Sequence, residues 1–367
     1  MLNSILIKNF KSLKDVRLSL TSLNILAGLN GSGKSSLIQA LLLLRQSIKK
    51  DGSQGLILQG EDFLHLGTGK DIFYQYAGRD ELIEFALADD KANNFLWKFQ
   101  YEISSDLLPF SPEHKNSLLP ALHLFRNNFQ YLNTEHLSSN DIFPRSESHI
   151  KTGSIGPKGE YAAHYLAEYG ISQQIACQQL QHPSARSLFL IHQVDAWLGE
   201  ISPGVKLIAE DIKTMGQARL AFKFETKDGY TNEIKPVNTG FGISYVLPVV
   251  LAILKARKGD LLIIENPESH LHPKGQSVLG RMMACAAMDG IQILAETHSD
   301  HFINGVRVAV KNGMPPSISR VFYFDRILGK TEQYSEVETI NFDKNGELSS
   351  YPRGFLDEWN EQLMQLI

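Results

Sequence analysis

The segment Gly28–Ser35 constrains the fold most strongly, because its glycines belong between a strand and a helix. It reads Gly-Leu-Asn-Gly-Ser-Gly-Lys-Ser and fits the pattern G-x-x-x-x-G-K-[ST]. An apolar run at 23–27 precedes it and the largely apolar stretch 36–48 follows it. In this setting the backbone N–H groups of the loop point inward, and the helix N-terminus favours an anion. The sequence therefore predicts a phosphate-binding loop (P-loop) between a buried strand and a buried helix.

The last residues of this pattern have defined roles at a bound nucleotide. The Lys34 ammonium reaches the β and γ phosphates, and the Ser35 hydroxyl binds Mg²⁺. We expect the Lys34 side chain to be exposed in the nucleotide-free protein. The loop residues expected to contact the nucleotide are Asn30, Gly31, Ser32, Gly33, Lys34, Ser35 and Ser36.

Two further apolar strands end in polar residues that suit the same ligand. The run Leu261–Ile264 is followed by Glu265, whose carboxylate is expected to hold Mg²⁺ directly or through water. Another apolar run, 291–295, is followed by Thr297 and His298. An imidazole at the carboxyl end of a parallel strand can sense the γ phosphate. We therefore expect Glu265 to be a metal ligand and His298 to be a catalytic residue.

Helical and strand patterns alternate through the last third of the chain. Such alternation favours a parallel sheet with helices on both faces, and hence an α/β fold. The expected helices are 244–256, 274–288 and 300–311, and the expected strands are 261–265, 291–295 and 320–325.

Earlier segments predict strands and helices of a different arrangement. Residues 2–20 indicate short strands, 81–103 a hairpin, and 104–158 an insertion with mobile loops. Helices are expected at 161–181 and 186–198, and a hairpin from 218–225 and 230–234. The expected division is an N-terminal lobe (1–103), an insertion (104–235), a C-terminal lobe (236–326) and an extension (327–367).

Composition excludes several other classes of protein. The net charge of −4 excludes a globally basic nucleic-acid coat, although a local patch that includes Lys49, Lys50, Lys70 and Arg79 stays open. Two cysteines are too few for a disulfide framework. The longest apolar run, Ala40–Leu44, is too short to span a membrane, and no signal peptide is visible, so the cytoplasm is expected. The pair His270 and His272 fits a loop better than a zinc site.

Three short motifs together resemble the ABC-type ATPase heads of RecF, SMC and OLD-family proteins. They are Asn9–Ser12 before the P-loop, Ile264–Pro273 around the acidic strand end, and Thr297–Ser299. This resemblance implies ATP and Mg²⁺ as cofactors, and Lys11 as a further nucleotide contact. It also implies an ABC-ATPase head, in which a parallel P-loop sheet is flanked by helices and joined by an N-terminal antiparallel β-subdomain and a helical insertion.

A closer resemblance is to bacterial AAA-type ATPases with a C-terminal domain of unknown function. It is carried by four more segments, namely 129–132, 156–161, 240–248 and 351–357. Such ATPases, including the Septu-like group, occur in phage-defence and DNA-processing loci, often beside a nuclease. No nuclease motif is visible in this sequence, so the resemblance implies a separate effector protein.

The ABC resemblance also implies a head-to-tail dimer around ATP, in which a signature segment of one chain faces the P-loop of the other. No LSGGQ sequence is present. The segment 238–244 has the corresponding position before the acidic strand and at the start of a helix. The residues expected to contact ATP of the second chain are therefore Gly240, Gly242 and Ser244.

Two departures from the ABC pattern bear on hydrolysis. Asn266 occupies the position of the usual catalytic glutamate, and an amide cannot act as a general base. Glu268 is the remaining carboxylate, so Asn266 and Glu268 join His298 as candidate catalytic residues. The glutamine that senses Mg²⁺ has three candidates, Gln54, Gln59 and Gln75.

Three functional hypotheses follow from the sequence. The first is a slowly hydrolysing ATPase that dimerises on ATP and controls an effector. The second is a non-hydrolytic, ATP-gated scaffold or sensor, for which Asn266 is the reason. The third is a DNA-binding repair clamp similar to RecF, for which measured salt dependence of DNA binding is the test.

Overall fold

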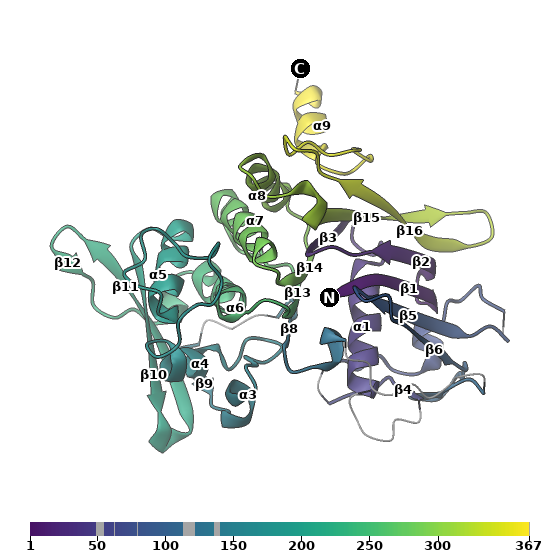
Figure 1. Ribbon diagram of the computed structural model, residues 1–367, viewed down its shortest axis with the longest axis horizontal. Coiled ribbons are helices and arrows are strands. Elements are labelled where there is room, and N and C mark those ends of the chain that lie inside the picture. The colour runs from purple at the N-terminus through teal and green to yellow at the C-terminus, as the bar shows by residue number, and fades with distance from the viewer. Residues whose placement is uncertain (49–54, 62, 79, 113–121, 136–139, 367) are drawn as a thin grey trace. The chain divides into compact units, whose positions relative to one another are not determined.

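The computed structural model describes residues 1–48, 55–61, 63–78, 80–112, 122–135 and 140–366 (Figure 1). The chain forms two compact units that do not follow sequence order. The P-loop unit comprises 1–126, 320–341 and 348–367. The acidic-strand unit comprises 127–319 and 342–347.

The P-loop unit begins with an antiparallel sheet in the order β2-β1-β5-β6. Alternating apolar residues such as Leu2, Ile5 and Ile7 are buried on one face of this sheet, as period-two patterning predicts. The expected hairpin at 81–103 is confirmed by the register that pairs Phe85 with Trp97. The strands are β1 (Leu2–Phe10), β2 (Leu13–Ser19), β5 (Ile83–Asp89) and β6 (Asn94–Phe99), with a separate pair, β4 (Gly55–Ile57) and β7 (Leu107–Pro109).

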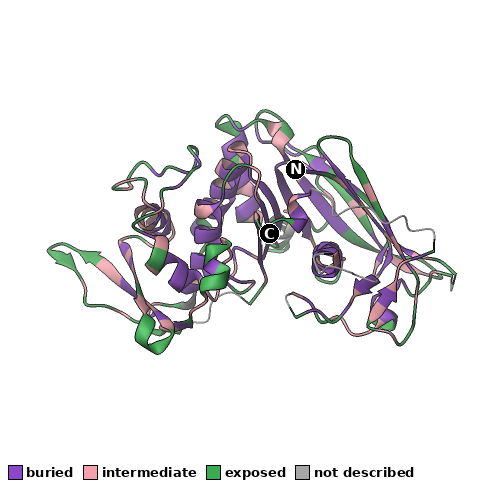
Figure 2. Ribbon diagram, turned by 60° about the horizontal axis from the view of Figure 1, so that its bottom comes forward, coloured by how far each residue is buried: buried purple, intermediate pink, exposed green. Residues whose placement is uncertain are grey.

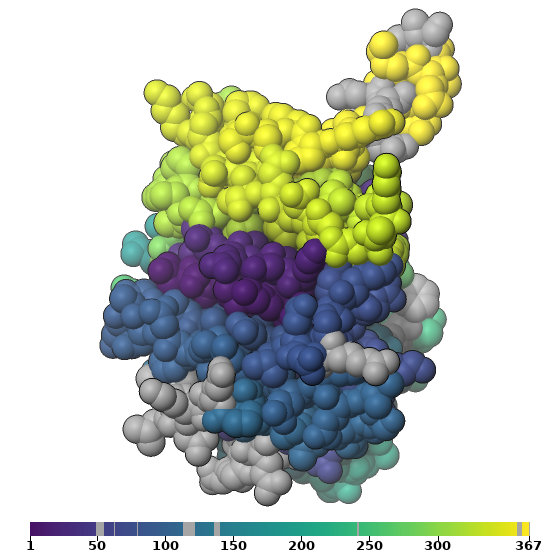
Figure 3. Space-filling model, turned by 90° about the vertical axis from the view of Figure 1, so that its right-hand side faces the viewer, coloured from purple at the N-terminus to yellow at the C-terminus, as the bar shows by residue number. Residues whose placement is uncertain are grey.

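A second group of strands in this unit carries the P-loop. Strand β3 (Leu23–Gly28) lies beside β15 (Ser319–Leu328), which pairs antiparallel with β16 (Gln333–Asn341). Figure 3 shows residues of the last part of the chain in yellow-green directly beside the purple N-terminal strands. The helix α1 (Lys34–Ile48) follows the loop and is buried on nearly all sides, as its apolar sequence predicts. The unit also contains α2 (Gly69–Ile72), η1 (His123–Phe125) and α9 (Glu358–Gln365).

Replacing Gly28 with alanine is expected to destabilise the P-loop unit by about 2 to 4 kcal/mol. A Cβ atom at this position would lie 2.2 Å from the carbonyl oxygen of Phe324, which belongs to the backbone of β15. The φ angle of 135° is also unfavourable for a residue with a side chain. Urea unfolding measures the change. Gly31→Ala is the matched control, because φ there is also positive but nothing lies within 4 Å of the added Cβ atom.

The acidic-strand unit contains three parallel strands in the order β14-β13-β8. They are β8 (Phe129–Leu132), β13 (Leu261–Glu265) and β14 (Gln292–Glu296), with the helices α6 (Phe241–Lys255), α7 (Pro273–Met288) and α8 (Asp300–Lys311). The alternation expected in the last third of the chain is therefore confirmed. Strand β8 differs from expectation, because it lies inside the segment interpreted as an insertion with mobile loops. Four residues are too few for periodicity to reveal a strand.

A second sheet in this unit is antiparallel and pairs β10, β11 and β12, with β9 on β11. Its strands are β9 (Ile142–Pro144), β10 (Val205–Ile212), β11 (Gln217–Thr226) and β12 (Gly229–Tyr230). The helices around it are α3 (Glu147–Lys151), α4 (Ala162–Tyr169) and α5 (Leu190–Ile201), and the short turns of this unit are η2 (Lys213–Met215), η3 (Pro236–Asn238) and η4 (Pro316–Ile318).

Two expected helices in this region have different bounds. The helix expected at 161–181 ends at Tyr169, where Gly170 follows and Ile171 is 74% exposed, so there is no apolar face to continue. The helix expected at 186–198 begins only at Leu190, because the Ser187 hydroxyl accepts the backbone N–H of Phe189 and holds a turn there. Strand β10 was not expected.

The arrangement confirms the expected α/β class, with an antiparallel N-terminal sheet and parallel strands accompanied by helices. Buried residues follow most of the strands and large parts of the helices (Figure 2). Within the part of the chain that the structure describes, no helix has the length and apolar character needed to cross a membrane.

Candidate functional site

The P-loop follows β3 and has the backbone geometry that its glycines allow. The φ angles of Gly31 and Gly33 are 75° and 107°. A Cβ atom at Gly33 would lie 2.4 Å from the Ser335 hydroxyl and 2.9 Å from the Ser12 hydroxyl. These two hydroxyls are themselves hydrogen-bonded at 2.7 Å. The Asn9–Ser12 motif and β16 therefore pack against the loop, and only glycine fits between them.

The prediction that the Lys34 side chain is exposed is wrong. It is buried and only 3% exposed. Its ammonium donates hydrogen bonds to the carbonyl oxygens of Gly28 at 2.8 Å and Leu29 at 2.9 Å. The long side chain thus folds over the loop to which it belongs, where carbonyl groups offset the cost of burying its charge. A phosphate oxygen would compete with these carbonyls for the same amine.

The remaining loop residues differ in exposure. Asn30 is exposed, whereas Ser35 and Ser36 are half-buried in the first turn of α1. Ser32 is 1% exposed, and its hydroxyl has no hydrogen-bond partner among the described residues. A buried hydroxyl without a partner is uncommon in native proteins, and a phosphate oxygen is an acceptor that suits it. The loop therefore fits a phosphate-bearing ligand.

Lys11 lies in a tight turn between β1 and β2. Its φ angle is 52°, and its ammonium donates to the Gln39 side chain on α1 at 2.6 Å. Burial lowers the pKa of Lys11, and the nearby Asp71 carboxylate partly opposes that shift. The amine is thus a partly dehydrated cation held against the helix that starts at the P-loop, which is the kind of group that binds an anionic ligand strongly.

A cavity of about 320 Å³ adjoins the P-loop within the same unit. It brings together residues far apart in the sequence, and its lining consists of Lys11, Ser12, Gly31, Lys70, Asp71, Phe73, Tyr74, Gln75, Arg326, Gln333 and Tyr334. Of the glutamines considered for Mg²⁺ sensing, Gln75 lines this cavity, whereas Gln59 contacts Gly67 and His65. Gln54 lies outside the described residues. Arg326 and Tyr334 were not expected in the site, because the hairpin that carries them shows no sequence motif.

The acidic strand β13 ends in the buried carboxylate of Glu265. The Tyr131 hydroxyl, on the neighbouring strand β8, donates to Glu265 Oε1 at 2.8 Å. In the parallel register Glu265 pairs with Glu296, the last residue of β14. Burial raises the pKa of Glu265 to about 7, with a smaller contribution from the Glu296 charge and an opposing one from Tyr131. Clustered carboxylates of this kind are stabilised by a divalent cation.

Glu268 is bonded to the segment that carries the predicted catalytic histidine. Its Oε1 accepts the Thr297 hydroxyl at 2.6 Å and the His298 backbone N–H at 3.0 Å. Burial raises the pKa of Glu268, and its second oxygen has no partner among the described residues. The His298 side chain is exposed. Glu268 thus fixes the Thr297–His298 backbone, and one carboxylate oxygen is left for another role.

Asn266 follows β13 with a left-handed backbone, since its φ angle is 45°. Asparagine tolerates this conformation better than glutamate does, which gives a physical reason for an amide at this position. Its backbone N–H donates to the Glu296 carbonyl at 2.8 Å. Its side-chain oxygen is buried and has no partner among the described residues.

The signature-like segment opens helix α6. Gly240 is exposed, has a φ angle of 81° and caps the helix, and Gly242 is half-buried. Ser244 is only 1% exposed, and its hydroxyl points into the protein. Exposed Gly240 is thus the most accessible of the three residues expected to contact a second chain, and Gly242 and Ser244 are less accessible in the single chain.

Other residues considered in the sequence have structural positions. His272 caps α7 by accepting the Lys274 backbone N–H at 3.3 Å, and His270 lies in a turn with a φ angle of 63°. The described residues contain no group of three or more side chains suited to a metal ion. Lys70 lines the cavity beside the P-loop, and the other three basic candidates, Lys49, Lys50 and Arg79, lie outside the described residues.

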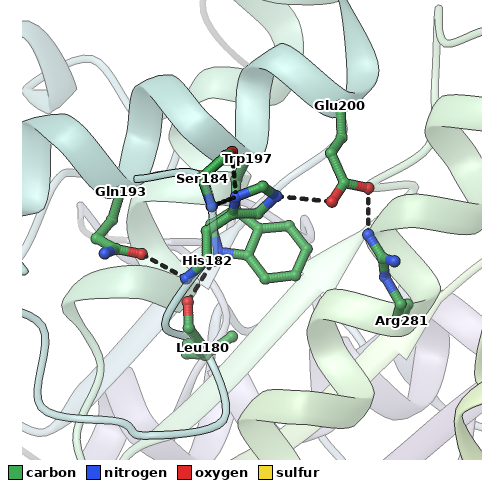
Figure 4. Close-up of polar contacts among 7 residues, drawn as sticks. All are labelled: Leu180, His182, Ser184, Gln193, Trp197, Glu200 and Arg281. Carbon is green, nitrogen blue, oxygen red and sulfur yellow. Dashed lines mark hydrogen bonds and ion pairs between the residues drawn. The ribbon is translucent and has the colours of Figure 1, made fainter. Parts of the chain in front are cut away.

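A polar cluster around His182 lies elsewhere in the acidic-strand unit (Figure 4). The Ser184 backbone N–H donates to His182 Nδ1 at 3.3 Å, so Nε2 carries the proton and donates to Glu200 at 2.6 Å. Glu200 also forms an ion pair with Arg281 on α7. The imidazole packs edge-on against Trp197 of α5, with ring centroids 5.2 Å apart. This cluster ties the loop before α5 to two helices and acts as a structural brace.

Replacing His182 with alanine is expected to destabilise the acidic-strand unit by about 3 kcal/mol. The change removes three contacts of the imidazole. They are the charge-assisted hydrogen bond from Nε2 to Glu200, the bond that Nδ1 accepts from the Ser184 backbone N–H, and the buried packing against Trp197. Chemical unfolding followed by tryptophan fluorescence measures the loss, because Trp197 lies in the cluster. His192→Ala is the matched control, since half-buried His192 bonds Ser187 at 2.8 Å and contacts the Phe189 ring, both outside the cluster. An equal loss in both variants would contradict the role of His182 as a brace.

Comparisons with known proteins support the interpretation of residues 28–35 as a P-loop, because these residues lie within a match to an AAA domain. Residues 23–304 match a family model described as "AAA domain, putative AbiEii toxin, Type IV TA system". Residues 314–366 match one described as "Protein of unknown function (DUF3696)". No curated protein matches the chain in sequence.

Several solved structures are similar at low identity. An SMC head bound to the C-terminal winged-helix domain of ScpA is 12% identical with a TM-score of 0.49, and the match covers 93% of this chain and 98% of that one. The SMC head domain from Thermotoga maritima is 11% identical with a TM-score of 0.39, covering 92% and 98%. An SMC head from Pyrococcus furiosus, bound to the C-terminal domain of ScpA, is 12% identical with a TM-score of 0.42, covering 100% and 99%.

The first family model extends from strand β3, before the P-loop, to helix α8, after His298. It therefore includes both the loop and the acidic strand, and it spans well over half of the chain. The chain belongs to this family of AAA domains.

Proposed function

We propose that the protein is an ABC-type ATPase that binds Mg·ATP, hydrolyses it slowly, dimerises around it and controls a separate effector. The observation that carries the proposal is the P-loop, with left-handed Gly31 and Gly33, a buried Ser32 hydroxyl that no described residue bonds, and an adjoining cavity of about 320 Å³. Phosphates suit the loop, and the cavity beside Gly31 is of a size to take part of a nucleoside.

The chain offers suitable oxygen donors for Mg²⁺. The Ser35 hydroxyl follows Lys34 in the P-loop pattern, and Glu265 provides a buried carboxylate whose pKa of about 7 would fall on binding a cation. When bound, Mg²⁺ would neutralise phosphate charge. The protein's own contribution is to orient the phosphates through Lys34, Lys11 and the loop N–H groups.

Slow hydrolysis is proposed because no ordinary general base follows Glu265. Asn266 cannot accept a proton, and Glu268 already holds the Thr297–His298 backbone. The second candidate, a non-hydrolytic ATP-gated scaffold or sensor, is favoured by the same bonds of Glu268. Phosphate release measured with and without a partner distinguishes the two functions, because the scaffold has no turnover in either condition.

A direct test of the proposed function is titration calorimetry of the full chain with Mg·ATP, followed by a phosphate-release assay. We expect saturable binding of one ATP per chain and slow release of phosphate. Absence of nucleotide binding would contradict both the ATPase and the scaffold.

The biological setting rests on resemblance and on the family description. That description names a putative AbiEii toxin of a type IV toxin–antitoxin system. We propose a cytoplasmic role in antiviral defence or DNA processing, in which the effector, a nuclease by the resemblance to Septu-like systems, is a separate chain. DNA is a further candidate partner. Co-purification of the ATPase with the product of a neighbouring nuclease gene tests this part of the proposal.

Gly240→Glu is expected to abolish ATP-dependent dimerisation. In the proposed dimer, exposed Gly240 at the start of α6 faces the γ phosphate of the second chain, and a carboxylate there is repelled by that phosphate. Sedimentation velocity with and without Mg·ATP measures the change in mass. Gly216→Glu is the control, because Gly216 is an exposed glycine with a similar φ angle of 64° away from α6. A dimer that persists in Gly240→Glu would contradict the signature assignment.

A further inference from the structure

A second cavity, of about 410 Å³, lies in the acidic-strand unit and has no part in the proposed ATPase site. It is formed at the amino ends of β8 and β13, beside Phe129, Asp260 and Leu262, whereas Glu265 lies at the carboxyl end of β13. Side chains from α3, α4 and the end of α6 complete it. The cavity is large enough for a ligand of the size of a mononucleotide.

The charges around this cavity favour an anion. Its charged lining residues are Lys151, Lys255, Arg257 and Asp260, which are three cations and one carboxylate. Lys151 forms an ion pair with Glu147 at 2.7 Å. The Asp260 carboxylate accepts the backbone N–H of Arg257 at 2.9 Å, not its guanidinium. Among the described residues, no carboxylate forms an ion pair with Lys255 or with the Arg257 side chain.

Lys255 is the most unusual of these groups. Its amine donates to the Gly153 carbonyl at 2.6 Å and lies 5.8 Å from the centre of the Tyr165 ring. Burial lowers the pKa of Lys255 to about 8, against a smaller opposing effect of Asp260. An ammonium in this position is poorly solvated, so an anion entering the cavity would gain more from it than from an exposed lysine.

The remaining lining groups suit a planar polar ring. Tyr165 and Tyr169 pack together with centroids 4.9 Å apart, and half-buried Tyr169 lines the cavity. The amides of Asn127, Asn128 and Gln173 also line it. Asn128 donates to the Gly259 carbonyl and Gln173 Oε1 accepts the Tyr165 hydroxyl, each at 2.8 Å, so the Asn127 amide and the Gln173 NH₂ group are the ones that can pair with the edge of a base. The aromatic rings and amides suit the base of a nucleotide, and the two neighbouring cations, Lys255 and Arg257, suit its phosphate.

We propose that the cavity lined by Lys255, Arg257 and Tyr169 is a second ligand site that binds a mononucleotide, with its phosphate on Lys255 and Arg257 and its base on Tyr169. The site is separate from the P-loop, and the inference does not rest on the proposed ATPase function.

Reductive labelling with pyridoxal 5′-phosphate tests the site in the full chain. The unprotonated Lys255 amine attacks the aldehyde carbon, water leaves as the imine forms, and borohydride then transfers hydride to the imine carbon and leaves a stable secondary amine. Peptide mapping by mass spectrometry reads each lysine separately. At pH 8 we expect Lys255 to be labelled roughly tenfold or more faster than Lys258, an exposed lysine outside the cavity.

Protection identifies the ligand class. We expect AMP to protect Lys255 at a concentration at least about tenfold lower than inorganic phosphate does, because the base adds stacking. The same protection is expected in a Lys34→Ala variant, which separates this site from the P-loop. The proposal is overturned if Lys255 reacts no faster than Lys258, if AMP protects no better than phosphate, if a single-stranded oligonucleotide protects at lower concentration than AMP, or if Lys34→Ala abolishes protection.

Discussion

Lys34→Ala is expected to weaken Mg·ATP binding by about 100-fold or more, because two charge-assisted hydrogen bonds to phosphate oxygens are lost. The wild-type amine now bonds the carbonyl groups of Gly28 and Leu29, so the variant also loses contacts that shape the loop. Calorimetric titration with Mg·ATP measures the affinity.

A matched control separates lost binding from a damaged fold. Lys8 is a partly exposed lysine on β1 whose amine lies 3.6 Å from Asp15, and Lys8→Ala should leave affinity unchanged. Thermal unfolding of Lys34→Ala should show a folded protein. If Lys34→Ala is folded and binds Mg·ATP like the wild type, the P-loop assignment is wrong.

Glu268→Gln is expected to lower ATP turnover by about 100-fold with ATP affinity unchanged, as is typical when a general base is removed. The second Glu268 oxygen is buried and has no partner among the described residues, so we expect it to be the atom that polarises water, since the other oxygen accepts bonds from Thr297 and His298. Phosphate release under saturating ATP measures the effect. His298→Ala should also lower turnover without changing affinity.

Thr297→Val is the control that separates a base from a positioning residue. It removes the hydroxyl that bonds Glu268 but leaves the carboxylate, so turnover should fall far less than in Glu268→Gln. Equal losses would assign Glu268 to positioning. Asn266→Glu restores a carboxylate at the usual ABC position and is expected to raise turnover, with a stability loss of about 1 kcal/mol from strain at a φ angle of 45°.

The parts of the fold and site that the sequence predicted are those specified by residues close together in the chain. The P-loop between β3 and α1, the acidic end of β13, and the strand–helix alternation from residue 261 onward all arise from local patterns. Hydrophobic period and glycine placement suffice for them.

What the sequence did not predict depends on distant contacts or on very short elements. The burial of Lys34 follows from the path of one flexible side chain, which no motif encodes. The cavity beside Gly31 joins residues more than 300 positions apart, such as Lys11 and Gln333. The partnership of Tyr131 with Glu265 requires β8 to be a strand, and its four residues are too few to show a period.

The P-loop unit is built from separate stretches of the chain, 1–126, 320–341 and 348–367, and this has a consequence for its synthesis on the ribosome. Strand β3 is translated early, but its neighbour β15 begins only at Ser319. At typical elongation rates, roughly 15 to 60 s separate the two strands, and during this time that edge of β3 has no partner. The nascent chain must therefore keep an apolar strand from pairing wrongly until β15 has been translated. The cavity beside Gly31 is likewise incomplete until then, because Arg326, Gln333 and Tyr334 line it.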